Sequence, residues 1–310
     1  MKLRLVDGSA NVPLAETVGA TLGVEPCKRT IERFADGELH VAILDSVRGG
    51  DVYVIQPTSP PVDEHVMELI FLADACRRAG AARITAVVPY FGYARQDRRA
   101  SGREAIGAAV VARLLEGAGV ARVVAVDLHA PEIEGFFRIP LEHLSAAPLL
   151  AAAVRADASS VLVAPDLGAV RLAQRYHKLL HLPIAIVHKT RVSGADVVLR
   201  SLMGEVRGRR PIIVDDMIST AATVEAAAAG LVEAGCTPEL SVLATHALFV
   251  GPAVRRLHAL PIVQLVGTDS VQQAGELPAH FQAVSLAPML ADAIARLHRD
   301  ESLDPLLVHA

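Results

Sequence analysis

The sequence lacks several features that would place it in a specialised class of protein. It has no Trp and three cysteines, and no uncharged apolar run reaches the roughly 18 residues of a membrane span. Cys27, Cys76 and Cys236 lie far apart and are odd in number, so we expect neither a disulfide framework nor a paired-thiolate metal site. The opening MKLRLVDGSA lacks the apolar core of a signal peptide. We therefore expect a reducing, cytoplasmic location and no membrane partner.

A large excess of charge is also absent. The net charge is −4 at pH 7 and the isoelectric point is near 6.3, which disfavours broad attraction to nucleic acid or anionic membranes. The 52% of hydrophobic residues and 21% of charged residues are typical of a globular α/β protein. At roughly 150 residues per domain, a chain of 310 residues predicts two domains.

Short β-branched runs alternate with amphipathic segments of helical length, which predicts parallel strands joined by crossover helices. Pro140 and Pro148, within IPLEHLSAAP, predict a boundary between domains 1–146 and 147–310. The expected strands are DVYVIQP, ITAVVPY, RVVAVDLH, SVLVAPD, IAIVHK, PIIVDD, SVLATH and IVQLV, and the expected helices cover residues 62–79, 104–118, 168–180, 222–234 and 289–298.

Polar residues that follow such strands are candidates for a ligand site, because ligands of open α/β sheets bind beyond the carboxyl ends of the strands. In VDDMISTAAT, Asp215 and Asp216 can accept hydrogen bonds from vicinal sugar hydroxyls, and the backbone N–H groups of Ser219 to Thr223 can hold a phosphate. A sugar phosphate can bind to both parts of this motif, its hydroxyls to the carboxylates and its phosphate to the backbone N–H groups. The alternative is an acidic strand end followed by an N-capping Ser219 or Thr220, which needs no ligand.

Of the other segments, one predicts a hairpin and the rest have both a functional and a structural interpretation. His129 and Asp166 each follow an apolar strand and offer a nitrogen and an oxygen ligand to a divalent ion, or are a core histidine and a solvated aspartate. YARQDRR places Arg95 to grip a polyphosphate, or is a charged loop. RFADGEL predicts a hairpin that turns at Asp36-Gly37. HKTR, residues 188–191, is a cationic loop that closes over a polyphosphate, or a basic turn.

The order of these segments resembles the ribose-phosphate diphosphokinase family, the phosphoribosyl pyrophosphate (PRPP) synthetases. The resemblance rests on RFADGE, VYVIQPTSPPVDEHVMEL, RITAVVPYFGYARQDRR, DLHAPEIEGFF, APDLGAVRLA, HKTR and VDDMISTAAT. It implies two tandem phosphoribosyltransferase-like domains, each a mainly parallel sheet flanked by helices. It also implies that the C1 hydroxyl of ribose 5-phosphate attacks the β-phosphorus of MgATP to give PRPP and AMP for nucleotide biosynthesis.

The resemblance further implies roles for individual residues. The first domain would be the ATP side and the second the ribose 5-phosphate side of a homo-oligomer whose adenine site is shared between neighbouring subunits. Mg²⁺ would be held near His129 and Asp166, and Lys189 and Arg191 would be catalytic. The remaining implied contacts are Phe34, Asp36, Glu38, Arg95, Gln96 and His129 with ATP, and Asp215, Asp216, Ser219, Thr220, Ala221, Ala222 and Thr223 with ribose 5-phosphate.

Some positions depart from the family pattern. Ala221 and Ala222 stand where the phosphate loop commonly has two glycines, and Ala169 stands where a second glycine is usual after Asp166, which predicts altered substrate affinity. Near the family's phosphate-activation site, this sequence keeps SVRG (residues 46–49) and Ser302. At two positions where the family usually has a serine, it has Asp304 and Gly80 instead. A carboxylate repels phosphate, so we expect weak activation by phosphate and weak inhibition by ADP.

Two other functions share parts of this pattern. A phosphoribosyltransferase that consumes PRPP has the acidic pair and the phosphate loop, but needs no tandem domains, RQD, DLHA or HKTR. A catalytically silent regulatory paralogue would be expected to lose the cations or metal ligands, whereas Lys189, Arg191, His129 and Asp166 are all present.

Overall fold

The computed structural model describes the backbone of residues 1–191 and 197–307 and the side chains of residues 1–187 and 202–307. Contacts divide the chain into two compact units. The first comprises residues 1–145, 270–272 and the described residues from Ser285 onward, and the second comprises residues 146–269 and 273–284. Both are α/β units, as the alternating sequence pattern predicts.

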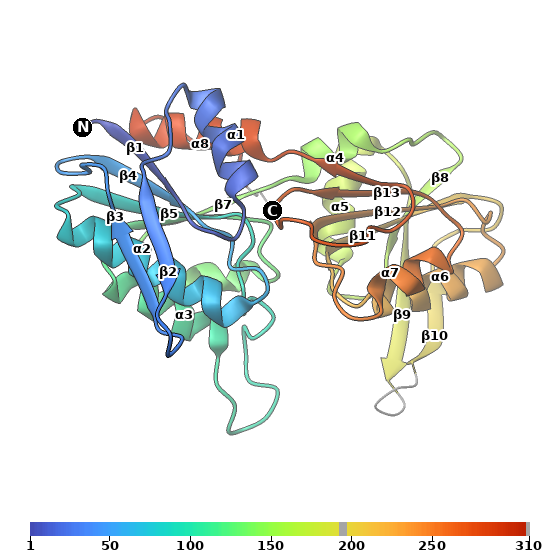
Figure 1. Cartoon of the computed structure of the whole chain (residues 1–310). Helices are drawn as coiled ribbons and strands as arrows, with labels where there is room; N and C mark the ends of the chain where they lie inside the picture. The colour runs from blue at the N-terminus through green and yellow to red at the C-terminus, as the bar shows by residue number, and fades with distance from the viewer. Residues whose placement is uncertain (192–196, 308–310) are drawn as a thin grey trace. The chain divides into compact units, whose positions relative to one another are not determined.

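The first unit is built on a parallel sheet that carries helices on both faces. Its elements are β1 (Leu3–Asp7), α1 (Val12–Leu22), β2 (Arg29–Arg33), β3 (Leu39–Ile43), β4 (Asp51–Ile55), α2 (Val62–Arg78), β5 (Arg83–Val88), α3 (Gly107–Gly117), β6 (Arg122–Val126), the 3-10 helix η1 (Pro131–Phe136), β7 (Leu141–Leu144) and α8 (Ala287–His298). The strand order is β1-β4-β5-β6-β7, and β2 and β3 form a separate hairpin. Helices α2 and α3 cover one face, while α1 and α8 pack together on the other (Figure 1).

The second unit has a larger sheet, parallel except at one edge. Its elements are α4 (Ala147–Ala153), β8 (Ser160–Ala164), α5 (Val170–Leu180), β9 (Ile184–Arg191), β10 (Val197–Met203), β11 (Arg210–Ile218), α6 (Ala222–Glu233), β12 (Leu240–Ala247), α7 (Ala253–His258), β13 (Ile262–Thr268) and β14 (Phe281–Val284). The strand order is β10-β9-β8-β11-β12-β13-β14, with β10 antiparallel to β9. Helices α4 and α5 pack on one face and α6 and α7 on the other.

The structure confirms each strand and helix expected above and adds elements that were not expected. The hairpin at Asp36-Gly37 is confirmed, with Gly37 at φ 92°. The segment IPLEHLSAAP, expected to be only a boundary, contains β7 and the start of α4. At the C-terminus the contact-based division differs from the expected 147–310 domain, because α8 groups with the first unit.

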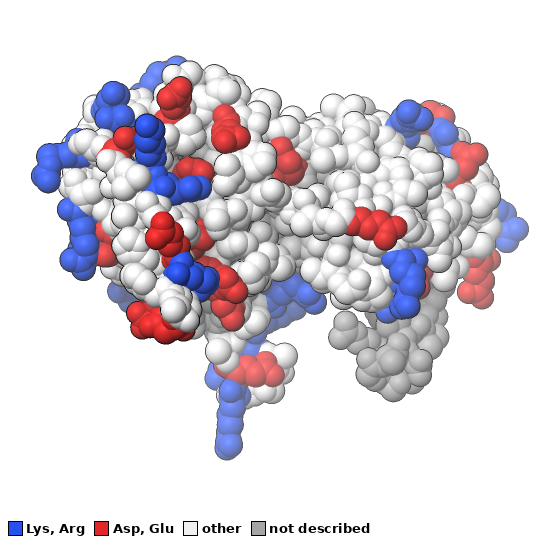
Figure 2. All heavy atoms as spheres, in the orientation of Figure 1, with Lys and Arg blue, Asp and Glu red and all other residues white. Residues whose placement is uncertain are grey.

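The surface of the first unit carries no single sign of charge on the face shown in Figure 2, where basic and acidic side chains are interspersed. Such a surface differs from the continuous basic stripe that nucleic-acid binding uses. Among the described residues, no helix combines the length and the apolar character that crossing a membrane requires.

A fully buried carboxylate ties α8 to the first sheet. Asp51, at the start of β4, is 0% exposed and accepts hydrogen bonds from Nε and Nη2 of Arg83, both at 2.7 Å. Nδ1 of His298 lies 2.8 Å from the same carboxylate, and the Tyr53 hydroxyl donates at 3.1 Å. Burial alone would raise the pKa of Asp51, but these hydrogen bonds outweigh it and hold the pKa below its ordinary value.

Replacing this carboxylate should destabilise the protein. We expect Asp51→Asn to cost about 3–5 kcal/mol of unfolding free energy at pH 7, because it leaves Arg83 partly buried without its counter-ion. Since the folded-state pKa is depressed, the stabilisation is present above the unfolded Asp value of about 3.9 and is lost as pH falls through the folded value. Thermal unfolding between pH 3 and pH 7 measures both effects. Asp300→Asn is the control, because Asp300 is 83% exposed and lies 3.6 Å from Arg83; equal losses in the two variants would contradict the assignment.

Candidate active site

The second sheet contains a point at which the chain switches direction between neighbouring strands. From β8 the chain continues to β9 on one side, and β11 lies on the other side. In open α/β sheets the crevice outside the carboxyl ends of two such strands is where ligands bind. Asp166 follows β8 by two residues, and Asp215 and Asp216 lie near the end of β11. The fold thus brings these predicted site residues to one edge.

The three carboxylates interact electrostatically. Burial raises the pKa of Asp215 well above its ordinary value, and the negative charges of Asp216 and Asp166 raise it further. The backbone N–H of Asp216 donates to Oδ1 of Asp215 at 3.0 Å. Oδ1 of Asp166, which is exposed, accepts from the N–H groups of Gly168 and Ala169 at 2.9 and 3.2 Å. Such a concentration of acceptors favours hydroxyl donors or a cation.

The predicted phosphate loop lies directly beyond these carboxylates. Ser219 and Thr220 follow β11, and α6 begins at Ala222, so the N–H groups of its first turn lie at the same edge. Ala221 is buried and has φ 61° and ψ 10°, the left-handed conformation that favours glycine. An alanine therefore occupies a conformation that glycine adopts more readily, and the predicted effect on substrate affinity stays a prediction.

The first unit gathers its candidates in a similar way. Arg95 and Gln96 follow β5 and His129 follows β6, and β5 pairs in parallel with β6. All three side chains are exposed. A hydrogen bond holds the loop after β5 in place, because Oγ1 of Thr58 accepts from Gly92 N at 2.6 Å. Gly107 allows the Gln96 side chain to approach, because a Cβ there would lie 2.7 Å from Oε1.

The hairpin carries the remaining candidates of the first unit. Phe34 is 57% exposed near its turn, and its ring centroid lies 5.5 Å from that of His40. Asp36 Oδ1 accepts from Glu38 N at 3.1 Å, and both side chains are exposed. An exposed aromatic side chain beside two carboxylates is available for stacking on a planar ligand.

Two predictions are left untested by this geometry. His129 belongs to the first unit and Asp166 to the second, so the metal pair stays a prediction. Among the side chains that the structure describes, those of residues 1–187 and 202–307, no three from His, Cys, Asp or Glu gather as a metal site. The expectation that HKTR is a loop or a turn is wrong for its backbone, because Lys189 and Arg191 lie in strand β9, paired with β10. Their side chains fall outside the described residues, so their catalytic role stays a prediction.

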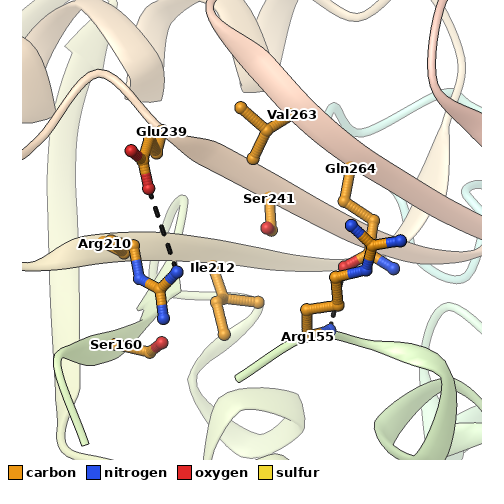
Figure 3. A pocket seen from close by; sticks show the side chains of 8 residues that line it. All are labelled: Arg155, Ser160, Arg210, Ile212, Glu239, Ser241, Val263 and Gln264. Atoms are coloured by element: carbon orange, nitrogen blue, oxygen red, sulfur yellow. Dashed lines mark hydrogen bonds and ion pairs between the residues drawn. The ribbon is translucent and has the colours of Figure 1, made fainter. Parts of the chain in front are cut away.

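A cavity of about 210 Å³ lies at the opposite edge of the second sheet, where strands begin (Figure 3). Several of its polar groups are bound to neighbours: Gln264 Oε1 accepts from Arg155 N at 2.9 Å, and Arg210 pairs with Asp157 and with Glu239. This arrangement is structural, and it lies away from Asp215 along the strands. The residues that line it are Arg155, Ser160, Arg210, Ile212, Glu239, Ser241, Val263 and Gln264.

One contact of the loop had no counterpart among the sequence-based candidates. Arg256 of α7 donates from Nη1 to the Thr220 carbonyl at 3.0 Å. No local motif marks this arginine, because it lies 36 residues after the loop and its neighbour Arg255 is also basic. Only the tertiary structure shows which of the two contacts the loop.

Comparisons with known proteins decide the family. Residues 3–119 match the family described as the N-terminal domain of ribose phosphate pyrophosphokinase, and residues 192–308 match the phosphoribosyl synthetase-associated domain. A ribose-phosphate pyrophosphokinase of Staphylococcus saprophyticus is 43% identical over 98% of this chain and 96% of its own length. The chain belongs to the ribose-phosphate pyrophosphokinase family.

Other members are similarly close in sequence and structure. Ribose-phosphate pyrophosphokinases of Staphylococcus epidermidis and Staphylococcus aureus are each 42% identical over 98% of this chain and 96% of their own. The crystal structure of phosphoribosylpyrophosphate synthetase from Mycobacterium smegmatis superposes with a TM-score of 0.90 at 36% identity, covering 97% of this chain and 100% of that one. The expected architecture of two phosphoribosyltransferase-like domains is thereby confirmed.

The alanine at the left-handed position gives a direct test of the loop geometry. We expect Ala221→Gly to stabilise the protein by up to about 1 kcal/mol, because relief of a left-handed conformation worth about 1–2 kcal/mol exceeds the entropic cost of glycine. Ala229→Gly is the control; Ala229 is exposed in the interior of α6, so this change should destabilise by about 0.5–1 kcal/mol. Thermal unfolding of both variants measures the difference, and the same sign in both would refute the conformational explanation.

Proposed function

We propose that this chain is a ribose-phosphate diphosphokinase that transfers the β,γ-diphosphoryl group of MgATP to the C1 hydroxyl of ribose 5-phosphate, giving PRPP and AMP. The observation that carries the proposal is the full-length identity with ribose-phosphate pyrophosphokinases. The acidic pair and helix start at one edge of the second sheet support it, because a phosphorylated sugar needs both.

Ribose 5-phosphate binds at the end of β11. Asp215 and Asp216 accept hydrogen bonds from the ribose hydroxyls, and a hydroxyl donor is favoured where the pKa of Asp215 is raised by burial and by neighbouring carboxylates. The loop from Ser219 to Thr223 holds the 5-phosphate with backbone N–H groups and the positive end of the α6 dipole. These contacts orient the C1 hydroxyl for attack.

ATP binds through the first unit. Arg95, Gln96 and His129 contact its phosphates and ribose, and their exposure at the ends of β5 and β6 leaves them accessible. Phe34, Asp36 and Glu38 contact adenine bound to a neighbouring subunit of a homo-oligomer, for which an exposed aromatic ring at a hairpin is suited.

Mg²⁺ fits the donor atoms at these sites. Asp166 offers carboxylate oxygen, the ligand type that Mg²⁺ prefers, and Mg²⁺ commonly takes only one or two protein carboxylates together with substrate phosphates. His129 would contribute through its ring nitrogen. Bound there, Mg²⁺ neutralises phosphate charge.

The transfer itself needs positioning and charge stabilisation more than covalent chemistry. The C1 oxygen forms a bond to the β-phosphorus, the bond from that phosphorus to the oxygen bridging to the α-phosphorus breaks, AMP leaves, and the hydroxyl proton passes to solvent or a nearby base. Lys189 and Arg191 offset the negative charge that accumulates on the transferring group. The enzyme acts in the cytoplasm, consistent with three free, buried cysteines.

The decisive assay supplies MgATP and ribose 5-phosphate and measures AMP. We expect AMP from the native protein, and turnover reduced about 100-fold or more by Lys189→Ala or Arg191→Ala with little change in ATP affinity, because the lost charges act in the transition state. Absence of AMP indicates a silent paralogue, and pyrophosphate release from PRPP and a base indicates a phosphoribosyltransferase. Unchanged turnover in both variants would remove these residues from the mechanism.

Activation by inorganic phosphate is expected to be weak. Asp304 is exposed beside Ser302, whose Oγ accepts from Asp304 N at 3.1 Å, and its carboxylate repels a phosphate anion there. Gly80 has φ 85°, and a Cβ at this position would lie 3.0 Å from Nη1 of Arg48. A serine at position 80 would therefore be strained. We expect less than about twofold stimulation by phosphate, increased in Asp304→Ser, by the same charge argument. Many-fold stimulation of the native enzyme would overturn this expectation.

A further inference from the structure

The segment that follows β12 binds successive carbonyl groups of the phosphate loop. Ile218 O accepts from Leu248 N and Phe249 N at 3.0 and 3.1 Å, and Ser219 O accepts from Val250 N at 3.0 Å. The next carbonyl, of Thr220, accepts from Nη1 of Arg256 at 3.0 Å. Backbone groups therefore bind the first two carbonyls, and a single side chain binds the third.

These hydrogen bonds set the direction of the amide groups. In a planar trans peptide the C=O of one residue and the N–H of the next point in opposite directions. The N–H groups of Ser219, Thr220 and Ala221 therefore point away from the segment 248–256 and form a row of adjacent donors. On that side of β11, pairing with β8 extends only from Arg210 to Ile213, so the donors lie past the end of β8. Successive backbone donors of this kind can bind an anion.

Arg256 also contacts the one acidic residue in the first turn of α6. Its Nε lies 3.0 Å from Oε2 of Glu225. An unpaired carboxylate within one helical turn of a bound phosphate opposes binding, because like charges repel. The fork of the guanidinium lets one side chain fix the Thr220 carbonyl and neutralise Glu225 together, which the point charge of lysine cannot do.

We infer that Arg256 is a positioning residue for ribose 5-phosphate: it orients the Thr220–Ala221 peptide so that its N–H faces the 5-phosphate, and it neutralises Glu225. The inference rests on the proposed function of the loop. Arg256 itself contacts the loop from the side opposite to the donors, so it acts through the backbone.

The test compares KM values for the two substrates. We expect Arg256→Ala to raise KM for ribose 5-phosphate roughly tenfold, the loss typical of a charged hydrogen bond, while KM for ATP changes less than about twofold. Titration calorimetry with ribose 5-phosphate alone should show the same loss. Arg256→Lys should recover part of the affinity, because it keeps the charge and one of the two contacts. Arg255→Ala removes an equal charge from the same helix and should leave both KM values unchanged, because Arg255 is exposed.

The role of charge is tested separately with Glu225→Gln. In the Arg256→Ala background this change should lower KM for ribose 5-phosphate, because it removes the unpaired carboxylate. An unchanged KM in the double variant would overturn the neutralising role. Equal KM values in Arg256→Ala and Arg255→Ala, with thermal unfolding unchanged, would overturn the positioning role. A native protein that forms no AMP would instead refute the proposed function, so the two failures are distinguishable.

Discussion

Parallel pairing between β8 and β11 is the constraint on which the second unit's chemistry depends. The two strands lie about 50 residues apart in sequence, and their register joins Ser160 to Arg210 and Val163 to Ile213. Asp166 and the pair Asp215–Asp216 thereby come close enough for their charges to interact, although mutual repulsion opposes this. Backbone hydrogen bonds and the apolar core beneath the strands supply the stabilisation that keeps the carboxylates together.

In each sheet, the residues at the starts of the strands and those at the ends of the strands differ in role. In the first unit the strand starts carry the buried contact of Asp51 with Arg83 and His298, while Arg95, Gln96 and His129 follow the strand ends and are exposed. In the second unit the strand starts carry Arg210, Glu239 and Gln264, whose polar groups are satisfied by neighbours. Polar groups that bind one another stabilise the fold, and polar groups left accessible at strand ends are available to substrates.

Sequence reasoning succeeded where the information is local. The strand that carries Asp215, the turn at Asp36-Gly37 and the helix after Thr220 each follow from a few adjacent residues. It failed at short elements with little periodicity, such as β7, whose residues LEHL place two polar side chains in the middle of a four-residue strand. It also failed for contacts made across the fold: nothing near α8 marks His298 as a partner of Asp51, and nothing near α7 separates Arg256 from Arg255.

The alanine at position 221 shows how long-range contacts can replace a local preference. A left-handed alanine costs about 1–2 kcal/mol, and a typical net hydrogen bond returns about 1 kcal/mol. Four hydrogen bonds from the segment 248–256 fix the carbonyls of Ile218, Ser219 and Thr220, so the peptide entering Ala221 is already oriented. Because these bonds together outweigh the cost of the conformation, the loop keeps its shape without glycine. The geometry of the loop between β11 and α6 is therefore a property of its packing against α7 and the preceding segment, more than of the residue types within it.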